Sequence, residues 1–256
     1  MAEDFELFTS LRYDPALVEV RGRGLNHAGW NWENSSPLYM LDYHRDRMLW
    51  AATHWGWDAA VEVLSGESGL ERLKDLVMMS LDETQSCSPM KVRISITQDG
   101  KLSITFAPTP EKSLANLFPE ALPRPSATQN GDAGQGAPSK SPEYEVLVDD
   151  LWSDRSEYTH FKTTQRAVYD GARQRAKINL PDPKEVLIVN KTNGTIMEGS
   201  TTTPYFWREG RWVTPAVSKE FDMEKGSGGQ NGTSRRWALE RYVVRRRRAG
   251  EIMSLT

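Results

Sequence analysis

Several short stretches of the chain are apolar or alternate between apolar and polar residues, a pattern typical of β-strands. These stretches are residues 5–13, 91–97, 102–106, 144–148, 186–190, 203–207 and 211–214. Asp99 and Gly100 lie between the second and third stretches, and the turn-like segment 208–210 lies between the last two. Each of these two pairs is therefore predicted to form a β-hairpin.

Other stretches carry apolar residues at every third or fourth position, which is typical of amphipathic helices. They are residues 38–57, 70–81 and 166–176. A further helix is predicted to start at Arg235, whereas residues 21–37, 65–69 and 149–158 are predicted to be loops. Strands and helices together predict a mixed α/β (α+β) fold.

Proline, serine, glycine, alanine, asparagine and glutamine dominate residues 109–142. Such a composition cannot bury enough apolar area to offset the entropy lost on ordering. We therefore predict a small N-terminal α/β domain at residues 1–108, a flexible linker at residues 109–142 and a C-terminal domain at residues 143–256.

Composition narrows the class of protein. The chain has 256 residues, is 38% hydrophobic and has a formal net charge of −3, which favours neither nucleic acid nor a membrane as its main partner. The chain has a single cysteine, Cys87, which cannot form an internal disulfide. No apolar run reaches the ~18 residues of a membrane span. The acidic N-terminus does not resemble a signal peptide. The arginines at residues 245–248 are expected to end a helix, although a nucleic-acid or import signal has the same composition. We predict a globular cytoplasmic protein without a metal site.

Two motifs in the C-terminal half carry candidate chemistry. Lys162 lies in HFKTTQR, residues 160–166, and Glu198 follows after 198 − 162 = 36 residues in MEGS. The run GSGGQNGTS, residues 226–234, precedes a predicted helix, so its backbone N–H groups could meet an anion. Each motif alone is weak evidence for a functional site, because most lysines are surface residues and most glycine-rich runs are ordinary loops.

In this order and spacing the motifs resemble those of fold-type IV pyridoxal-phosphate enzymes, which include aminodeoxychorismate lyases, branched-chain aminotransferases and D-amino acid aminotransferases. The segments FELFTSLRYDP, FKTT-x-R and N-K-x-x-G-x-x-MEGS are similar to those of fungal aminodeoxychorismate lyases. The resemblance covers most of the chain from Phe5 to Arg236. It implies a two-domain fold with a C-terminal cofactor-binding domain, a cofactor between the domains, and a homodimer. Relatives continue past the point that corresponds to Thr256, so a truncated C-terminus is also implied and a non-catalytic relative stays open.

The resemblance assigns roles around pyridoxal 5′-phosphate. Lys162 would bind the cofactor covalently and act as general base. Glu198 would keep the ring nitrogen protonated, because a nearby carboxylate favours a cationic group. The phosphate would be anchored by Arg47, Thr233 and Ser234.

Three basic residues are candidates for binding a dicarboxylate substrate, namely Arg12, Lys91 and Arg93. Lys91 and Arg93 share one face of a predicted strand, because strand side chains alternate. Other interpretations stay open from the residues alone. The two strand residues could form an exposed charged face, Arg12 could pair with Asp14, and Arg47 could be a solvated partner of a neighbouring carboxylate.

These assignments predict a carbon-oxygen lyase that converts 4-amino-4-deoxychorismate to 4-aminobenzoate and pyruvate in folate biosynthesis. Basic residues suit this dicarboxylate, whereas a branched-chain aminotransferase needs an apolar side-chain pocket. The same cofactor residues would serve transamination. A class IV aminotransferase of the branched-chain or D-amino acid type is therefore the alternative.

Overall fold

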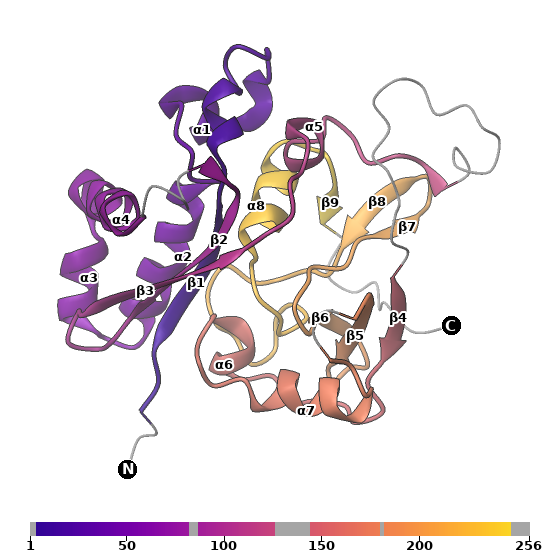
Figure 1. The fold of residues 1–256 in the computed structure, drawn as a ribbon. Coiled ribbons are helices and arrows are strands. Elements are labelled where there is room, and N and C mark those ends of the chain that lie inside the picture. Colours follow the sequence, from indigo (N-terminus) through magenta and orange to yellow (C-terminus); the bar gives the residue numbers. More distant parts are fainter. Residues whose placement is uncertain (1–3, 82–86, 126–143, 180–181, 247–256) are drawn as a thin grey trace. The chain divides into compact units, whose positions relative to one another are not determined.

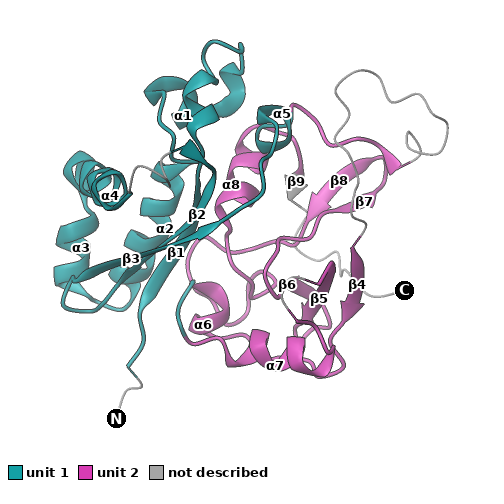
Figure 2. Ribbon diagram, viewed as in Figure 1, with its two compact units in different colours: residues 1–119, 162–164 teal, residues 120–161, 165–256 magenta. Residues whose placement is uncertain are grey.

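The computed structural model describes residues 4–81, 87–125, 144–179 and 182–246 (Figure 1). The chain divides into two compact units, which are coloured separately in Figure 2. Unit 1 comprises residues 1–119 and 162–164, and unit 2 comprises residues 120–161 and 165–256. This division differs from the predicted one, because the three residues Lys162–Thr164 pack with the N-terminal unit.

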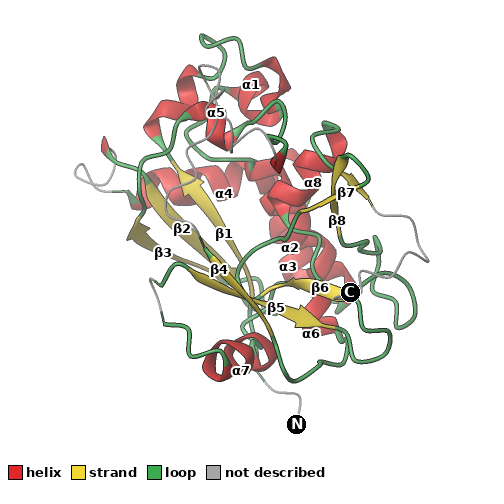
Figure 3. Ribbon diagram, turned by 90° about the vertical axis from the view of Figure 1, so that its right-hand side faces the viewer, coloured by secondary structure: helices red, strands yellow, loops and turns green. Residues whose placement is uncertain are grey.

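Unit 1 is built on an antiparallel sheet in the order β1-β2-β3. Its strands are β1 (Leu7–Tyr13), β2 (Met90–Ile96) and β3 (Leu102–Pro108), which confirm the first three predicted strands. They run side by side in the turned view of Figure 3. Gly100, in the turn between β2 and β3, has a φ of +81°, a conformation that glycine adopts without steric strain.

Helices cover one face of this sheet. Thr9 on β1 contacts His44 on α2 (Leu41–His54), so the buried face of β1 is the one that meets this helix. α3 (Asp58–Leu64) and α4 (Gly66–Ser80) pack beside α2 (Figure 1). The predicted helices at residues 38–57 and 70–81 are confirmed. α3 was not predicted, and the first turn of α4 occupies a predicted loop.

The segment 21–37 is not the continuous loop that its composition predicts. It contains a short 3-10 helix (Asn26–Ala28) and α1 (Trp30–Asn34), and another 3-10 helix (Pro15–Glu19) follows β1. Asn31 explains this order, because its fully buried amide makes three hydrogen bonds with the backbone just before α2. The hydrogen bonds of a buried polar side chain therefore order this segment. Its short helices lack the apolar periodicity by which a longer helix is recognised in the sequence.

The first part of the predicted linker packs within unit 1. α5 (Leu114–Leu117) is capped by the hydroxyl of Ser113. Phe118 is 1% exposed, and its ring centre lies 5.1 Å from that of Tyr39. This aromatic contact anchors the segment, whereas residues 126–142 of the predicted linker lie outside the described residues.

Unit 2 contains a mixed sheet in the order β4-β5-β6. β4 (Glu145–Val148) is parallel to β5 (Lys184–Val189), and β6 (Ile196–Gly199) is antiparallel to β5. α6 (Glu157–His160) and α7 (Ala167–Arg175) lie between β4 and β5 in the chain. An apolar cluster joins α7 to the sheet, and its buried members are Tyr169, Ala172, Ile178, Val186, Ile188 and Met197. The predicted strands and the helix at residues 166–176 are confirmed, but α6 occupies the end of a predicted loop.

A second sheet in unit 2 has the order β7-β8-β9. β7 (Phe206–Arg208) and β8 (Arg211–Thr214) form the predicted hairpin. β9 (Arg245–Arg246) pairs in parallel with β8, so the prediction of a helix end is wrong for these two arginines, whereas residues 247 and 248 lie outside the described part of the chain. α8 (Thr233–Glu240) stops before them, and the buried Val244 leads into the strand.

Within the described ranges, no helix combines the length and the apolar character needed to cross a membrane. The same ranges hold no group of three or more His, Cys, Asp and Glu side chains placed to bind a metal ion. Cys87 is exposed.

Candidate active site

Lys162 lies at the edge of the unit 1 sheet, where residues 162–164 extend it beyond β1. The N–H of Phe8 donates a hydrogen bond to the carbonyl of Lys162 (3.1 Å), and the N–H of Thr164 donates to the carbonyl of Glu6 (3.0 Å). This antiparallel register places Lys162 opposite Phe8, so the two side chains project from the same face of the sheet. The half-buried lysine therefore has the fixed backbone of a strand residue.

The ring of Phe8 lies beside two cations. The Cζ atom of Arg93 lies 4.0 Å from the ring centre, and the Nζ atom of Lys162 lies 4.9 Å from it. Arg93 is the cross-strand partner of Ser10, which is on the same face as Phe8. Because Phe8 is 5% exposed, its attraction for cations is stronger than at an open surface. One buried ring thus holds the Lys162 amine and the Arg93 guanidinium.

Lys91 and Arg12 lie further along this face as direct cross-strand partners. Lys91 is exposed and shares the face with Arg93, as the strand pattern predicts. The Arg12 side chain, in contrast, is only 12% exposed and binds Asp14 at 2.7 Å. It also donates to the carbonyl of Pro110 at 2.9 Å. The alternative interpretation of Arg12, pairing with Asp14, therefore matches the structure, and Lys91 and Arg93 are the stronger substrate candidates.

Arg47 contacts the other face of β1. Its guanidinium donates a hydrogen bond to the hydroxyl of Thr9 and lies 3.4 Å from Nδ1 of His44. The Thr9 hydroxyl oxygen lies 2.6 Å from the same Nδ1. A guanidinium can only donate, so its approach to Nδ1 makes that nitrogen an acceptor, and the Thr9 hydroxyl proton is directed to Nδ1. The three side chains form a hydrogen-bonded chain that fixes the guanidinium.

His44 is 2% exposed and neutral. Its pKa lies well below 6.5, because burial disfavours the charged ring and the positive charges of Arg47 and Lys162 oppose a third one. A neutral ring with an unprotonated Nδ1 is the form that accepts the Thr9 proton.

In unit 2, the carboxylate of Glu198 is held by Tyr169 and Gln230. The Tyr169 hydroxyl donates to Oε1 of Glu198 at 2.5 Å, and the backbone N–H of Gln230 donates to the same oxygen at 3.3 Å. The Gln230 side chain donates to the Tyr169 hydroxyl oxygen at 3.2 Å. Burial, together with the charge of Glu198, raises the pKa of Tyr169 well above 10. The hydroxyl therefore stays protonated and keeps donating.

The glycine-rich run lies against the strand that carries Glu198. The carbonyl oxygens of residues 225–228 accept hydrogen bonds from the side chains of Arg155, Thr159 and Asn190. Gly228 has a φ of +88°, and a Cβ on Gly229 would lie 2.5 Å from the carbonyl oxygen of Met197. These glycines allow close packing onto β6, whereas the anion binding expected of the run stays a prediction.

Thr233 and Ser234 form the first turn of α8, which begins earlier than the predicted start at Arg235. Thr233 is half-buried and Ser234 is exposed. A hydrogen bond joins Ser234 to the hydroxyl of Tyr205. Burial raises the pKa of Tyr205 to about 12, although this hydrogen bond and the charge of Arg235 oppose the shift. The two residues predicted to bind the phosphate therefore lie together in the first turn of α8.

Arg235 stabilises that turn from within. Its side chain is 1% exposed and donates to the Asn231 side chain and to the carbonyl of Pro215, both at 2.7 Å. The buried Arg235 guanidinium thus joins Asn231, which precedes α8, to Pro215, which follows β8.

Glu185, at the start of β5, fixes the loop that follows Glu198. Its carboxylate is 4% exposed and accepts hydrogen bonds from Ser200, Thr201 and Thr202. Burial acts to raise the pKa of Glu185, but these hydrogen bonds outweigh it, so the pKa lies below 4.5. The strand that presents Glu198 thus ends in a rigid turn.

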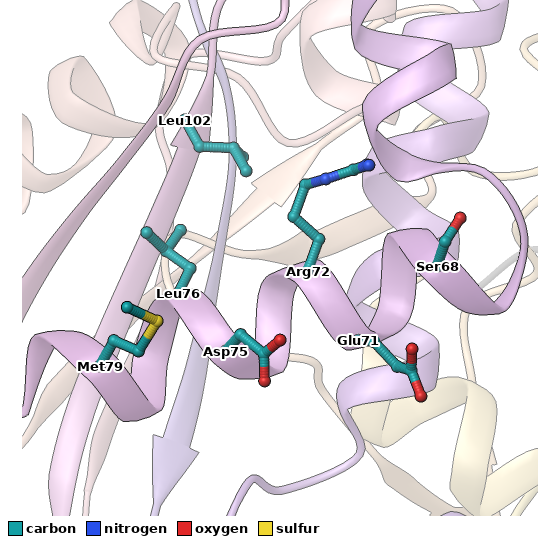
Figure 4. Close-up of a pocket in the computed structure, with 7 residues that line it drawn as sticks. All are labelled: Ser68, Glu71, Arg72, Asp75, Leu76, Met79 and Leu102. Carbon is teal, nitrogen blue, oxygen red and sulfur yellow. The ribbon is translucent and has the colours of Figure 1, made fainter.

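A surface hollow lies on the outside of unit 1, between α4 and β3. Figure 4 shows its lining, which consists of Ser68, Glu71, Arg72, Asp75, Leu76, Met79 and Leu102. None of the candidate site residues lines it. The hollow is therefore separate from the candidate chemistry.

Sequence reasoning missed the supporting side chains, which are Thr9, His44, Tyr169, Glu185 and Gln230. A usable signal exists for Glu185, because a carboxylate that opens an apolar strand needs buried partners. His44 precedes Arg47 by one helical turn, so a contact between them was also foreseeable. The other three depend on pairings between distant segments.

Comparison with solved structures identifies similar folds. A protein described as an amino-acid aminotransferase from Mesorhizobium loti shares 18% identity and a TM-score of 0.57, over 98% of this chain and 88% of that one. A protein described as a branched-chain amino acid aminotransferase from Thermotoga maritima shares 13% identity and a TM-score of 0.55, over 96% and 67% of the two chains. A hypothetical aminotransferase from Mycobacterium tuberculosis, in its PLP-bound form, shares 12% identity and a TM-score of 0.50, over 95% and 71%.

Among curated proteins no match was found. The family model of class IV amino-transferases, in contrast, matches residues 29–245, which is most of the chain. The mixed α/β architecture agrees with this match and confirms the predicted fold class. The family is one of pyridoxal-phosphate enzymes, so the expected cofactor is confirmed at the level of the family. The chain belongs to the class IV aminotransferase family.

Proposed function

We propose that this chain converts 4-amino-4-deoxychorismate to 4-aminobenzoate and pyruvate, with pyridoxal phosphate bound through Lys162. The observation that carries the proposal is the arrangement at Phe8, where the Lys162 amine and the Arg93 guanidinium lie beside one buried ring. A group that can move a proton is thereby placed near a cation that can bind a carboxylate. The exposed Lys91 on the same sheet face adds a second positive charge for a dicarboxylate.

The side chains present fit the cofactor by their chemistry. Unit 1 offers the amine of Lys162 and the guanidinium of Arg47, which the Thr9 hydroxyl holds in place. Unit 2 offers the carboxylate of Glu198 and the first turn of α8 with Thr233 and Ser234. Lys162 would hold the cofactor covalently, Arg47 and the α8 turn its phosphate, and Glu198 its ring nitrogen. When bound, pyridoxal phosphate supplies an electron sink for negative charge at the carbon that bears the amine.

Lys162 would move protons in two steps of the lyase reaction. Its Nζ would first take the proton from the ring carbon that bears the substrate amine. The carbon–oxygen bond to the enolpyruvyl group then breaks, its electron pair leaves with the oxygen, and the ring becomes aromatic. Lys162 would return the proton to the departing enol carbon, which gives pyruvate. Arg93 and Lys91 would hold the carboxylates and so orient the ring toward Nζ.

An aminotransferase of the branched-chain or D-amino acid type is the second candidate. The solved structures similar to this chain are described as aminotransferases, and this observation favours it. The same Lys162 would then return the proton to the cofactor rather than to an enol. The two candidates differ in their need for a 2-oxo acid acceptor.

One experiment separates them. The chain, loaded with pyridoxal phosphate, is incubated with 4-amino-4-deoxychorismate in the absence of any 2-oxo acid. We expect 4-aminobenzoate and pyruvate in equal amounts. Ready amino transfer from leucine or D-alanine to 2-oxoglutarate, without 4-aminobenzoate, would establish the second candidate and exclude the lyase.

We also propose that two copies of the chain form a dimer, as the family resemblance implies, and that the protein acts in the cytosol. Sedimentation of the purified chain at several concentrations tests the dimer. A constant monomer mass across those concentrations would contradict it.

A further inference from the structure

We propose that Tyr169 and Gln230 are positioning residues for Glu198, and that together they set the protonation of the cofactor ring nitrogen. The inference rests on the proposed binding of pyridoxal phosphate and adds two residues to which the sequence assigned no role. It is carried by the convergence of two donors on one carboxylate oxygen, the hydroxyl of Tyr169 at 2.5 Å and the N–H of Gln230 at 3.3 Å.

The Tyr169 hydroxyl has a single proton to give. It lies 3.2 Å from the carbonyl oxygen of Thr159 and 2.5 Å from Oε1 of Glu198. The shorter contact to a charged acceptor takes the proton, because charge-assisted hydrogen bonds are the stronger ones. Gln230 then approaches the hydroxyl oxygen from its acceptor side, with Nε2 at 3.2 Å. The three side chains therefore have one consistent set of donors and acceptors.

Gln230 reaches Glu198 because of the glycine-rich run before it. The carbonyl oxygens of this run accept hydrogen bonds from Arg155, Thr159 and Asn190, and Gly229 packs directly on the backbone of Met197. These contacts fix the turn, so the next backbone N–H, that of Gln230, is directed at the carboxylate. The glycine-rich run thus positions the N–H of Gln230 on Glu198, and α7 positions the hydroxyl of Tyr169 on the same carboxylate.

Hydrogen bonds donated to a carboxylate favour its charged form and hold it in one orientation. A carboxylate kept ionised would in turn keep the ring nitrogen of the cofactor protonated. Loss of the Tyr169 hydroxyl should therefore free the orientation of the carboxylate and weaken its contact with the ring nitrogen, without removing its charge. The expected effect is about tenfold in the ratio of protonated to unprotonated ring nitrogen, which is one pH unit.

The test uses pyridoxal phosphate labelled with ¹⁵N in the ring, bound to the wild type, Tyr169→Phe, Gln230→Leu and Tyr144→Phe. The ¹⁵N chemical shift is followed against pH, and thermal unfolding of each protein shows whether it is folded. In Tyr169→Phe we expect the ring nitrogen to lose its proton about one pH unit lower than in the wild type. Gln230→Leu should move the titration less and in the same direction. Tyr144→Phe, at a residue that is 58% exposed, should leave the titration unchanged.

The result distinguishes this inference from the proposed function. A wild type that does not take up the cofactor overturns both. Uptake by the wild type with the same ¹⁵N titration in Tyr169→Phe and Gln230→Leu overturns the positioning role alone. A fall in melting temperature without a change in the titration would show that Tyr169 is only a packing residue. If Tyr169→Phe does not fold, Gln230→Leu still tests the inference, because an unchanged ¹⁵N titration in that variant would contradict it.

Discussion

The guanidinium of Arg47 donates a hydrogen bond to the hydroxyl of Thr9, so a helix residue and a strand residue share a polar contact within a largely apolar interface. The same hydroxyl reaches the neutral ring of His44. Thr9 therefore connects the candidate phosphate-binding cation to a buried support.

Replacing this hydroxyl tests the connection. Thr9→Val keeps the shape of the side chain but leaves the Arg47 donor and the His44 acceptor without their shared partner, at a cost of about 1–3 kcal/mol in unfolding free energy. We also expect weaker binding of pyridoxal phosphate, by about tenfold, measured by equilibrium titration. Thr105→Val, at an exposed position of β3, is the matched control. Equal affinities in both variants would show that Arg47 does not depend on Thr9.

Lys162 provides the simplest test of the cofactor site. Lys162→Ala should abolish the visible absorbance of covalently bound pyridoxal phosphate, because only an amine can form that bond. Lys101→Ala, at an exposed position next to a turn, should behave as the wild type. Mass spectrometry after borohydride reduction locates the modified residue. Attachment at another lysine, with absorbance retained in Lys162→Ala, would contradict the assignment.

Arg93 should affect the substrate more than the cofactor. Arg93→Gln removes the charge beside Phe8, and we expect KM for 4-amino-4-deoxychorismate to rise about tenfold or more, with pyridoxal phosphate affinity changed less than twofold. Lys91→Gln should have a smaller effect, because Lys91 is exposed and its charge is screened by solvent. Equal losses of substrate and cofactor binding in Arg93→Gln would indicate that Arg93 supports the fold.

Glu185 makes the stability of unit 2 depend on pH. The pKa of Glu185 in the folded protein lies below 4.5, so its contribution to stability is present above that pH and is lost as the pH falls through the folded value. Glu185→Gln places an amide among donors and should lower the unfolding free energy at pH 7 by about 2 kcal/mol or more.

Denaturant unfolding of the wild type and Glu185→Gln at pH 7 and at lower pH measures this dependence. The difference between the two proteins should shrink by at most ~1.4 kcal/mol per pH unit below pH 4.5. Glu71→Gln, on the exposed side of α4, should give no such difference. A gap between wild type and Glu185→Gln that stays constant with pH would show that the charge of Glu185 does not stabilise the fold.

Local patterns were sufficient for most of the fold. The two hairpins were predictable because strand alternation and the turn residues Gly100 and Gly210 lie within a few positions of each other. α3 was missed because it is short and directly precedes α4, so no separate apolar stripe marks it. Arg245 and Arg246 were predicted to end a helix but form a strand. A run of arginines has no periodicity that distinguishes a strand from the end of a helix.

The candidate site was predictable only in part. The motifs made Lys162 and Glu198 candidates through the family resemblance, which stays a prediction. The alternation of a strand correctly placed Lys91 and Arg93 on one face. The side chains that hold these groups were not predictable, because partners such as Tyr169 and Glu198 are brought together by tertiary packing. The ion pair of Arg12 with Asp14, in contrast, was predictable, because the two residues are only two positions apart in the sequence.

The pairing of Lys162 with the edge of β1 has a consequence for biosynthesis. β1 ends at residue 13, and its outer neighbour is made 162 − 13 = 149 residues later, a delay of roughly 7–30 s at ~5–20 residues per second. During that time the edge of β1 is an open template on the nascent chain, available to other strands. A fragment of residues 1–119 would keep this edge open permanently. Adding the peptide of residues 160–166 to such a fragment should suppress its aggregation, whereas a scrambled peptide should not.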